Sequence, residues 1–126
     1  SDPMLKGHIV QYLQAPDEQI MNLYAFARAF VFPTFIEGFG IPPLEAMSFG
    51  VPVVCSDIPA VREVCGGAVR YADPLDPGSF AREIRSCMSD PQMNSIFRKG
   101  GLERLSLYRR DRALTQYMDL FRSFRE

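Results

Sequence analysis

The chain has 126 residues, of which 47% are hydrophobic and 23% charged, and its formal net charge is -1 at pH 7. These values fit one soluble α/β or α domain. The chain does not have the excess of basic residues that is typical of a nucleic-acid-binding protein. No apolar run reaches the roughly 18 residues of a membrane span, and the first residues do not resemble a signal peptide, so we expect a cytoplasmic protein, at most peripheral to a membrane.

The first part of the chain predicts two strands with a helix between them. The segment 8–13 (HIVQYL) has the β-branched and aromatic content of a strand, and Asp17 is placed to cap the helix that follows. A short apolar run at 29–33 ends at Pro33, as a buried strand of a parallel sheet should. The helix is expected to bury four residues at helical spacing: Ile20, Leu23, Tyr24 and Ala27.

The middle of the chain continues the alternation. The stretch LEAMSFG predicts two helical turns that end at Gly50, where a left-handed residue belongs. Strands follow at 51–55 and 68–72, with a short helix at 58–64 between them. Strands and helices in this order predict an α/β fold, a Rossmann-like parallel sheet flanked by helices.

Two Asp-Pro pairs predict the starts of the next two helices. Asp76 and Asp90 each precede a proline, which suits the first helical position. Gly100 and Gly101 should weaken or bend the second of these helices, and a last helix is expected at about 111–125. The two helices should turn these residues inward: Phe80, Ile84, Cys87 and Met88 in the first, and Met93, Ile96, Phe97 and Leu102 in the second.

The cysteines and the histidine predict no metal site. Cys55, Cys65 and Cys87 show neither CxxC nor Cys/His spacing, and His8 is the only histidine of the sequence. An odd number of widely spaced cysteines does not indicate a disulfide framework either. We expect three small buried residues and neither a metal nor another cofactor.

The stretch EGFGIPPLEAM (37–47) directly follows the 29–33 strand, at the sheet edge where ligands bind in such folds. Gly38 and Gly40 allow positive φ angles and close approach of a ligand, and the two prolines fit a first helical turn. The free amides of Phe39, Gly40 and Ile41 can then bind a phosphate at the helix N-terminus. Glu37 and Glu45 can accept hydrogen bonds from hydroxyl groups, so the stretch suits a nucleotide diphosphate sugar.

The region 29–80 closely resembles the C-terminal, donor-binding domain of family 4 retaining glycosyltransferases of the GT-B fold. The resemblance lies in a strand ending in Pro-Thr, an E-x7-E motif containing GFG, a Pro-Val strand, Ser-Asp and a closing Asp-Pro. It implies that Glu37 contacts the donor sugar and is the catalytic residue, that the amides of 38–41 hold the diphosphate, and that Glu45 binds the ribose. No metal is implied in the site.

The resemblance also implies what the chain would need for turnover. Residues 1–126 match the later two-thirds of one domain, a truncated nucleotide-sugar-binding domain, and the acceptor-binding N-terminal domain and an upstream cation lie outside it. We therefore expect a donor domain for transfer of a hexosyl group, mannosyl included, to a glycan or lipid acceptor, inactive by itself. Two alternatives stay open: a non-catalytic sugar-nucleotide-binding or interaction module, and a sugar-nucleotide epimerase, which does not characteristically carry E-x7-E.

The same resemblance predicts an anomaly in the sheet. In the parent fold two strands, both absent here, separate the strand matching 8–13 from the strand at 29–33. A gap would leave apolar strand faces in water, at about 25 cal/mol for each Å². We therefore expect either that 8–13 moves beside 29–33, or that a second copy of the chain fills the space.

Overall fold

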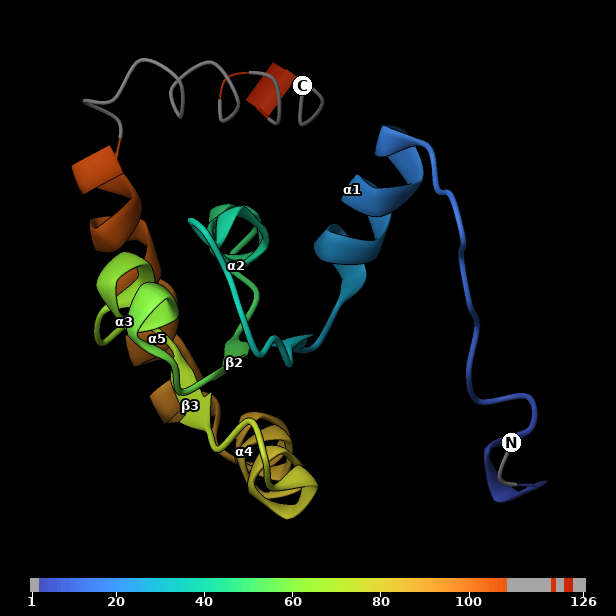
Figure 1. Ribbon diagram of the computed structural model, residues 1–126. Coiled ribbons are helices and arrows are strands. Elements are labelled where there is room, and N and C mark those ends of the chain that lie inside the picture. The colour runs from blue at the N-terminus through green and yellow to red at the C-terminus, as the bar shows by residue number, and fades with distance from the viewer. Residues whose placement is uncertain (1–2, 109–118, 120–121, 124–126) are drawn as a thin grey trace.

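The computed structural model describes residues 3–108, 119, 122 and 123. Its centre is a three-stranded parallel sheet in the order β1-β2-β3, with helices around it (Figure 1). The predicted α/β class, a Rossmann-like parallel sheet flanked by helices, is confirmed. The strands are β1 (Phe30–Phe32), β2 (Val53–Ser56) and β3 (Arg70–Ala72), and between residues 17 and 108 the helices are α1 (Asp17–Phe26), α2 (Ile41–Ser48), α3 (Pro59–Cys65), α4 (Pro77–Ser89) and α5 (Pro91–Tyr108).

The central strand β2 is buried on both faces of the sheet. Val53 and Cys55 pack into a cluster built with residues of α1, α2, α3 and α5. Val54 points the other way and packs with Phe80 and Cys87 of α4. Successive side chains of a strand point to opposite faces, so a strand covered by helices on both sides reads as an unbroken apolar run.

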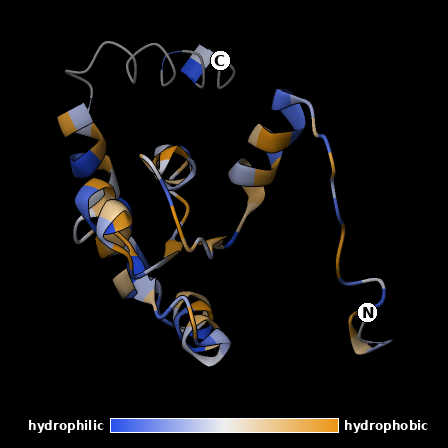
Figure 2. Cartoon of the chain, in the orientation of Figure 1, coloured by the Kyte–Doolittle hydropathy of each residue, from blue (hydrophilic) through white to orange (hydrophobic). Residues whose placement is uncertain are grey.

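The prediction of a strand at 8–13 is wrong. After a short 3-10 helix (Pro3–Leu5), the chain runs to α1 as an irregular segment that pairs with no strand of the described sheet. Figure 1 shows this segment apart from the rest of the fold, and Figure 2 shows apolar residues along it. The expectation that 8–13 moves beside β1 is therefore wrong too, while association with a second copy stays a prediction. Four apolar side chains of the segment 8–13 are exposed: Ile9, Val10, Tyr12 and Leu13.

A strand needs a neighbour that accepts and donates its backbone hydrogen bonds and covers its apolar face. The segment 8–13 has no such neighbour among the described residues; of its backbone amides, that of His8 donates to the Leu5 carbonyl at 3.0 Å within a local turn. His8, which was expected at the edge of this strand, lies instead in an exposed turn. At the other side of the gap, the three residues of β1 are only half-buried.

The helix starts at the two Asp-Pro pairs are confirmed. The Asp76 carboxylate accepts a hydrogen bond from the Gly78 amide at 2.8 Å, and the Asp90 carboxylate accepts one from the Met93 amide at 2.9 Å. Asp17, in contrast, does not cap α1: it is the first helical residue, Pro16 precedes it, and no side-chain cap bond forms. As an acidic residue in the first turn, Asp17 still favours the helix through its dipole.

The inward faces of the helices were predicted only in part. Met21 and Tyr24 of α1 are buried, whereas Leu23 is half exposed; Phe80 and Cys87 of α4 are buried, whereas Met88 is exposed. In α5 the buried residues are Gly101 and Leu105. The predicted inward residues Met93, Ile96 and Leu102 of α5 are exposed, so that expectation is wrong for them. The helix expected at 111–125 lies mostly outside the described residues.

Gly100 and Gly101 do not interrupt α5, which continues through both. A Cβ atom at Gly101 would lie 3.2 Å from the Met47 Cγ atom of α2, while one at Gly100 would meet Ala68 only at 3.7 Å. Gly101 therefore lets α5 approach α2 closely, and this contact determines which face of α5 is inward.

The two glycines of α5 are expected to respond oppositely to substitution. Gly100→Ala should stabilise the fold by about 0.5–1 kcal/mol, because alanine favours the helix and the space is sufficient. Gly101→Val should destabilise it by about 1–3 kcal/mol, because the added atoms collide with Met47. Urea unfolding of both variants measures the difference, and equal effects of the two changes would contradict the packing described.

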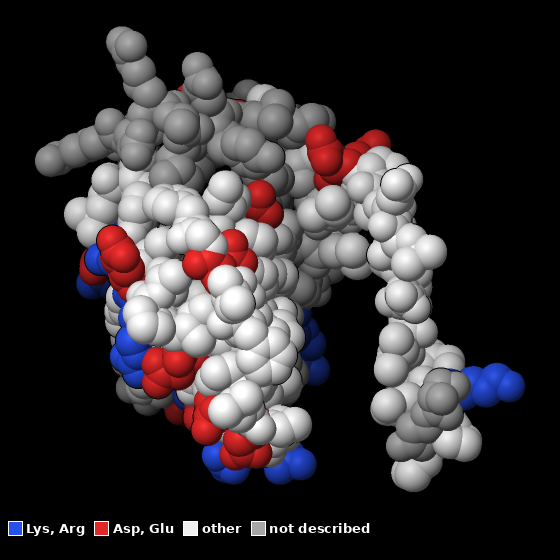
Figure 3. Space-filling model, viewed as in Figure 1, with Lys and Arg blue, Asp and Glu red and all other residues white. Residues whose placement is uncertain are grey.

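Charged side chains of both signs lie on the face of the molecule that Figure 3 shows. Acidic and basic side chains lie beside one another on this face. Two exposed ion pairs join Arg62 to Asp57 and Arg82 to Asp76, the latter at 3.4 Å. Exposed pairs of this kind contribute little to stability, so the apolar core carries the fold.

The cysteine prediction is confirmed for burial. Cys55, Cys65 and Cys87 are free and buried. Gly50 has the left-handed backbone expected of it, with φ of 70°. The strand predicted at 51–55 is present, but it begins two residues later and ends one residue later, at Val53–Ser56.

Candidate functional site

The segment 33–40 connects the carboxyl end of β1 to α2. Gly40 is the N-cap of α2 and has φ 79° and ψ 46°, a left-handed conformation that confirms the positive φ expected of this glycine. Pro42 and Pro43 lie in the first helical turn, where no amide is needed. The tight turn thus ends in a helix whose N-terminus faces the edge at which α/β sheets bind ligands.

Three successive backbone amides lie unused at this helix start. Phe39, Gly40 and Ile41 donate no hydrogen bond to any residue in the described part of the chain. Unpaired amides at a helix N-terminus carry about half a positive charge and favour an anion. The geometry therefore supports the predicted phosphate site.

Gly38 differs from the expectation. Its φ is not positive, and its amide donates a hydrogen bond to the Glu37 carboxylate at 3.2 Å. A Cβ atom at this position would meet nothing within 4 Å. The space beside Gly38 is therefore open, and it leaves room for a ligand next to the turn.

Glu37 is half-buried and lies over the turn that it begins. Its Cγ atom is 3.8 Å from the position of a Cβ atom on Gly40, and its Oε1 atom accepts the Gly38 amide. The preceding residues Thr34 and Ile36 are joined by a hydrogen bond of 2.8 Å from the Thr34 hydroxyl to the Ile36 carbonyl. The carboxylate is therefore held beside the free amides rather than extended into solvent.

Glu45 lies one turn into α2 and is also half-buried. Its Oε2 atom accepts a hydrogen bond of 3.0 Å from the Tyr24 hydroxyl of α1. Burial raises the pKa of Glu45, the Tyr24 hydrogen bond opposes that rise, and the charge of Asp17 adds to it. Burial also raises the pKa of Tyr24, so its hydroxyl stays protonated and remains a donor.

The sequence did not identify two tertiary contacts of this segment, one made by Glu45 and the other by Phe39. Tyr24 was expected only as a buried helix residue, and Tyr108 was not singled out. The Phe39 ring lies edge-on against the Tyr108 ring of α5, with 5.7 Å between the centroids. Both contacts join residues far apart in the sequence, so no local pattern signals them.

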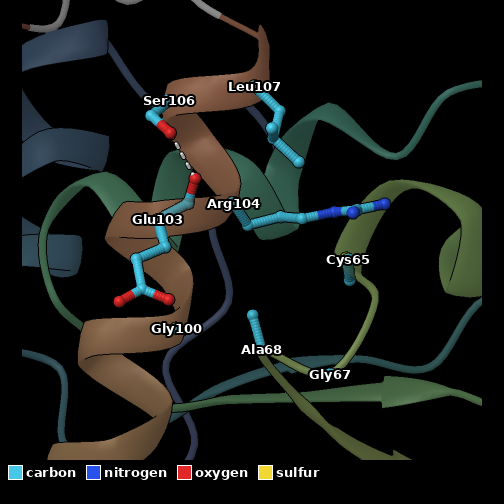
Figure 4. A pocket seen from close by; sticks show the side chains of 8 residues that line it. All are labelled: Cys65, Gly67, Ala68, Gly100, Glu103, Arg104, Ser106 and Leu107. Atoms are coloured by element: carbon cyan, nitrogen blue, oxygen red, sulfur yellow. Dashed lines mark hydrogen bonds between the residues drawn. The ribbon is translucent and has the colours of Figure 1, made fainter.

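A separate hollow of about 550 Å³ lies between α5 and the loop that follows α3. Figure 4 shows the Arg104 side chain reaching across it toward that loop, where the guanidinium donates to the Val64 carbonyl at 2.7 Å and also to the Glu63 carbonyl. Arg104 thus binds the carbonyl end of α3. None of the predicted site residues lines this hollow; its lining residues are Cys65, Gly67, Ala68, Gly100, Glu103, Arg104, Ser106 and Leu107.

In the described part of the chain, no group of three or more His, Cys, Asp or Glu side chains is placed to hold a metal ion. No helix within that part is both long enough and apolar enough to cross a membrane.

Comparison with known proteins identifies the family. The sequence profile of "Glycosyl transferases group 1" matches residues 3–104, which include the whole segment from Glu37 to Glu45. The chain belongs to this glycosyltransferase family. The glycosyltransferase chain is also 40% identical over 114 residues to "O-antigen chain mannosyltransferase B" of Escherichia coli, covering 90% of this chain and 30% of that protein.

A second curated relative and one solved structure are also similar to the chain. The glycosyltransferase chain is 36% identical over 96 residues to "O-antigen chain mannosyltransferase RfbU" of Salmonella typhimurium, covering 76% of this chain and 27% of that protein. Its fold resembles sucrose-phosphate synthase from Thermosynechococcus elongatus with a TM-score of 0.71 at 23% identity, covering 95% of this chain and 32% of that one. The chain therefore spans about a third of the length of these proteins.

Proposed function

We propose that this chain is the donor-binding part of a family 4 retaining glycosyltransferase of the GT-B type. In such an enzyme it would be part of the C-terminal domain. The proposal rests above all on one observation: three unpartnered amides at the start of α2 lie between two half-buried glutamates. Amides suit a diphosphate and carboxylates suit hydroxyl groups. A nucleotide diphosphate sugar has this order of groups.

Each part of the segment has a role in the proposal. The amides of 39–41 bind the diphosphate, Glu45 accepts hydrogen bonds from the ribose, and Glu37 accepts them from the transferred sugar. Positive charge develops on the sugar ring in the transition state, so an ionised Glu37 binds that state more tightly than the ground state. The metal-free donor site would then bind its ligand through backbone amides and carboxylates.

The relatives favour one sugar. Both curated relatives named above are mannosyltransferases of O-antigen chains, so we propose a mannosyl donor and a glycan or lipid-linked acceptor, used in the cytoplasm for polysaccharide synthesis. The test is an assay of the full-length transferase with GDP-, UDP- and ADP-linked hexoses. The product should keep the anomeric configuration of the donor in its NMR coupling constants; inversion, or donor use without transfer, would contradict the proposal.

The 126-residue chain by itself is expected to transfer no sugar, and to bind UDP, GDP and ADP weakly or not at all. The reason is that the acceptor site and the cation that stabilises the leaving diphosphate would be contributed by other parts of the protein. Calorimetric titration and a radiolabelled transfer assay measure both properties. Tight binding would instead favour a stand-alone sugar-nucleotide-binding module, and detectable transfer would contradict the expectation.

A further inference from the structure

Two aromatic rings pack against the ring of Tyr24, whose hydroxyl group contacts Glu45. Its ring lies against Phe30 of β1 and Phe49 after α2, with centroid distances of 5.4 and 5.5 Å. Tyr24 is only 7% exposed. It belongs to α1, and the two rings that cover it belong to other elements. The aromatic contacts therefore determine where the hydroxyl points.

That hydroxyl occupies one oxygen of the Glu45 carboxylate. It donates to Oε2 at 3.0 Å, and Oε1 has no hydrogen-bond partner within the described residues. A carboxylate has two oxygens with several acceptor positions, so one is used inside the protein and the other is left for a ligand. A single hydrogen bond thus fixes the rotamer and also orients the free oxygen.

We infer that Tyr24 is a positioning residue for nucleotide binding: it holds Glu45 so that Oε1 accepts a hydrogen bond from a ribose hydroxyl of the donor. The inference rests on the proposed function, because it presumes that Glu45 binds the nucleotide. It adds a residue of α1, outside the E-x7-E stretch, to the machinery of the site.

The hydrogen bond has an electrostatic consequence as well. Within the described residues, the titratable groups that act on the Glu45 carboxylate are Tyr24 and Asp17, both on α1. Burial and Asp17 favour the neutral acid, whereas the Tyr24 hydroxyl stabilises the carboxylate. Without that hydroxyl the pKa of Glu45 rises further. As the pH is lowered, the carboxylate is then protonated at a higher pH than in the parent, and nucleotide binding that needs the carboxylate should be lost at that higher pH.

The test compares Tyr24→Phe with Tyr71→Phe in the full-length transferase. Both changes keep the ring and remove one hydroxyl, but Tyr71 donates to the Gly66 carbonyl, at 2.6 Å, and not to Glu45. Tyr24→Phe should weaken GDP or UDP binding by about three- to tenfold, the effect of one hydrogen bond. It should raise the donor KM more than it lowers kcat, because the ribose contact is the same in ground and transition states. Tyr71→Phe should change neither.

Two further measurements make the inference decidable. NMR titration of the Glu45 side chain should show a higher pKa in Tyr24→Phe, and Tyr24→Phe should add no further loss of affinity in the Glu45→Gln background. An unchanged Glu45 pKa, or a loss equal to that of Tyr71→Phe, would overturn the positioning role. If Glu45→Gln alone leaves the nucleotide affinity unchanged, Glu45 does not bind the nucleotide. The proposed function of Glu45 is then wrong, and the positioning role of Tyr24 is wrong with it.

Discussion

Replacing Glu45 by glutamine is expected to weaken the free nucleotide diphosphate and the nucleotide sugar alike, each by about tenfold to a hundredfold. The ribose is common to both ligands, and the loss of a hydrogen bond to a charged acceptor costs about 1.5–3 kcal/mol. Calorimetry of both ligands on the full-length transferase measures it. Glu63→Gln, which removes the same charge from an exposed residue of α3, should leave both affinities unchanged.

The stability of the Glu45→Gln variant separates a binding defect from a folding defect. Burial raises the pKa of Glu45 in the folded chain, so ionisation of Glu45 opposes folding. The stability that the neutral acid contributes is lost as the pH rises through that raised pKa. Glutamine has no such charge, and the variant should be at least as stable as the parent at pH 7. Unchanged nucleotide affinity would instead make Glu45 an ordinary helix residue.

Replacing Glu37 by glutamine should have its largest effect on turnover. We expect kcat to fall by about tenfold to a hundredfold, the donor affinity to fall less, and the affinity for the free nucleotide diphosphate to stay unchanged. A contact that strengthens as positive charge develops on the sugar acts mainly in the transition state. Steady-state kinetics beside calorimetry distinguish these quantities.

The two glutamate variants serve as controls for each other. Both remove one carboxylate from the same short segment, so a general disturbance of the turn would affect both in the same way. Equal losses of free nucleotide in Glu37→Gln and Glu45→Gln would show that the glutamates do not divide the ligand between ribose and sugar. A fall in donor affinity larger than the fall in kcat would place Glu37 in ground-state binding alone.

The sequence by itself determined the features that depend on neighbouring residues. Asp76 and Asp90 cap their helices because an aspartate before a proline satisfies the first amides in any fold. Gly40 has positive φ because a turn directly before a helix requires it. The unbroken apolar run of β2 indicates a strand covered on both faces. Local signals of this kind are sufficient to place the E-x7-E segment after a strand and across the start of a helix.

Only the tertiary structure decided which partners each element meets. The segment 8–13 has the composition of a strand, but a strand forms only beside an edge that pairs with it. The inward face of α5 follows from the approach of Gly101 to Met47, which no helical period reveals. The hydrogen bond from Tyr24 to Glu45 likewise joins residues that are 21 positions apart. Composition and spacing record what a residue can do locally, whereas packing selects the neighbour with which it does so.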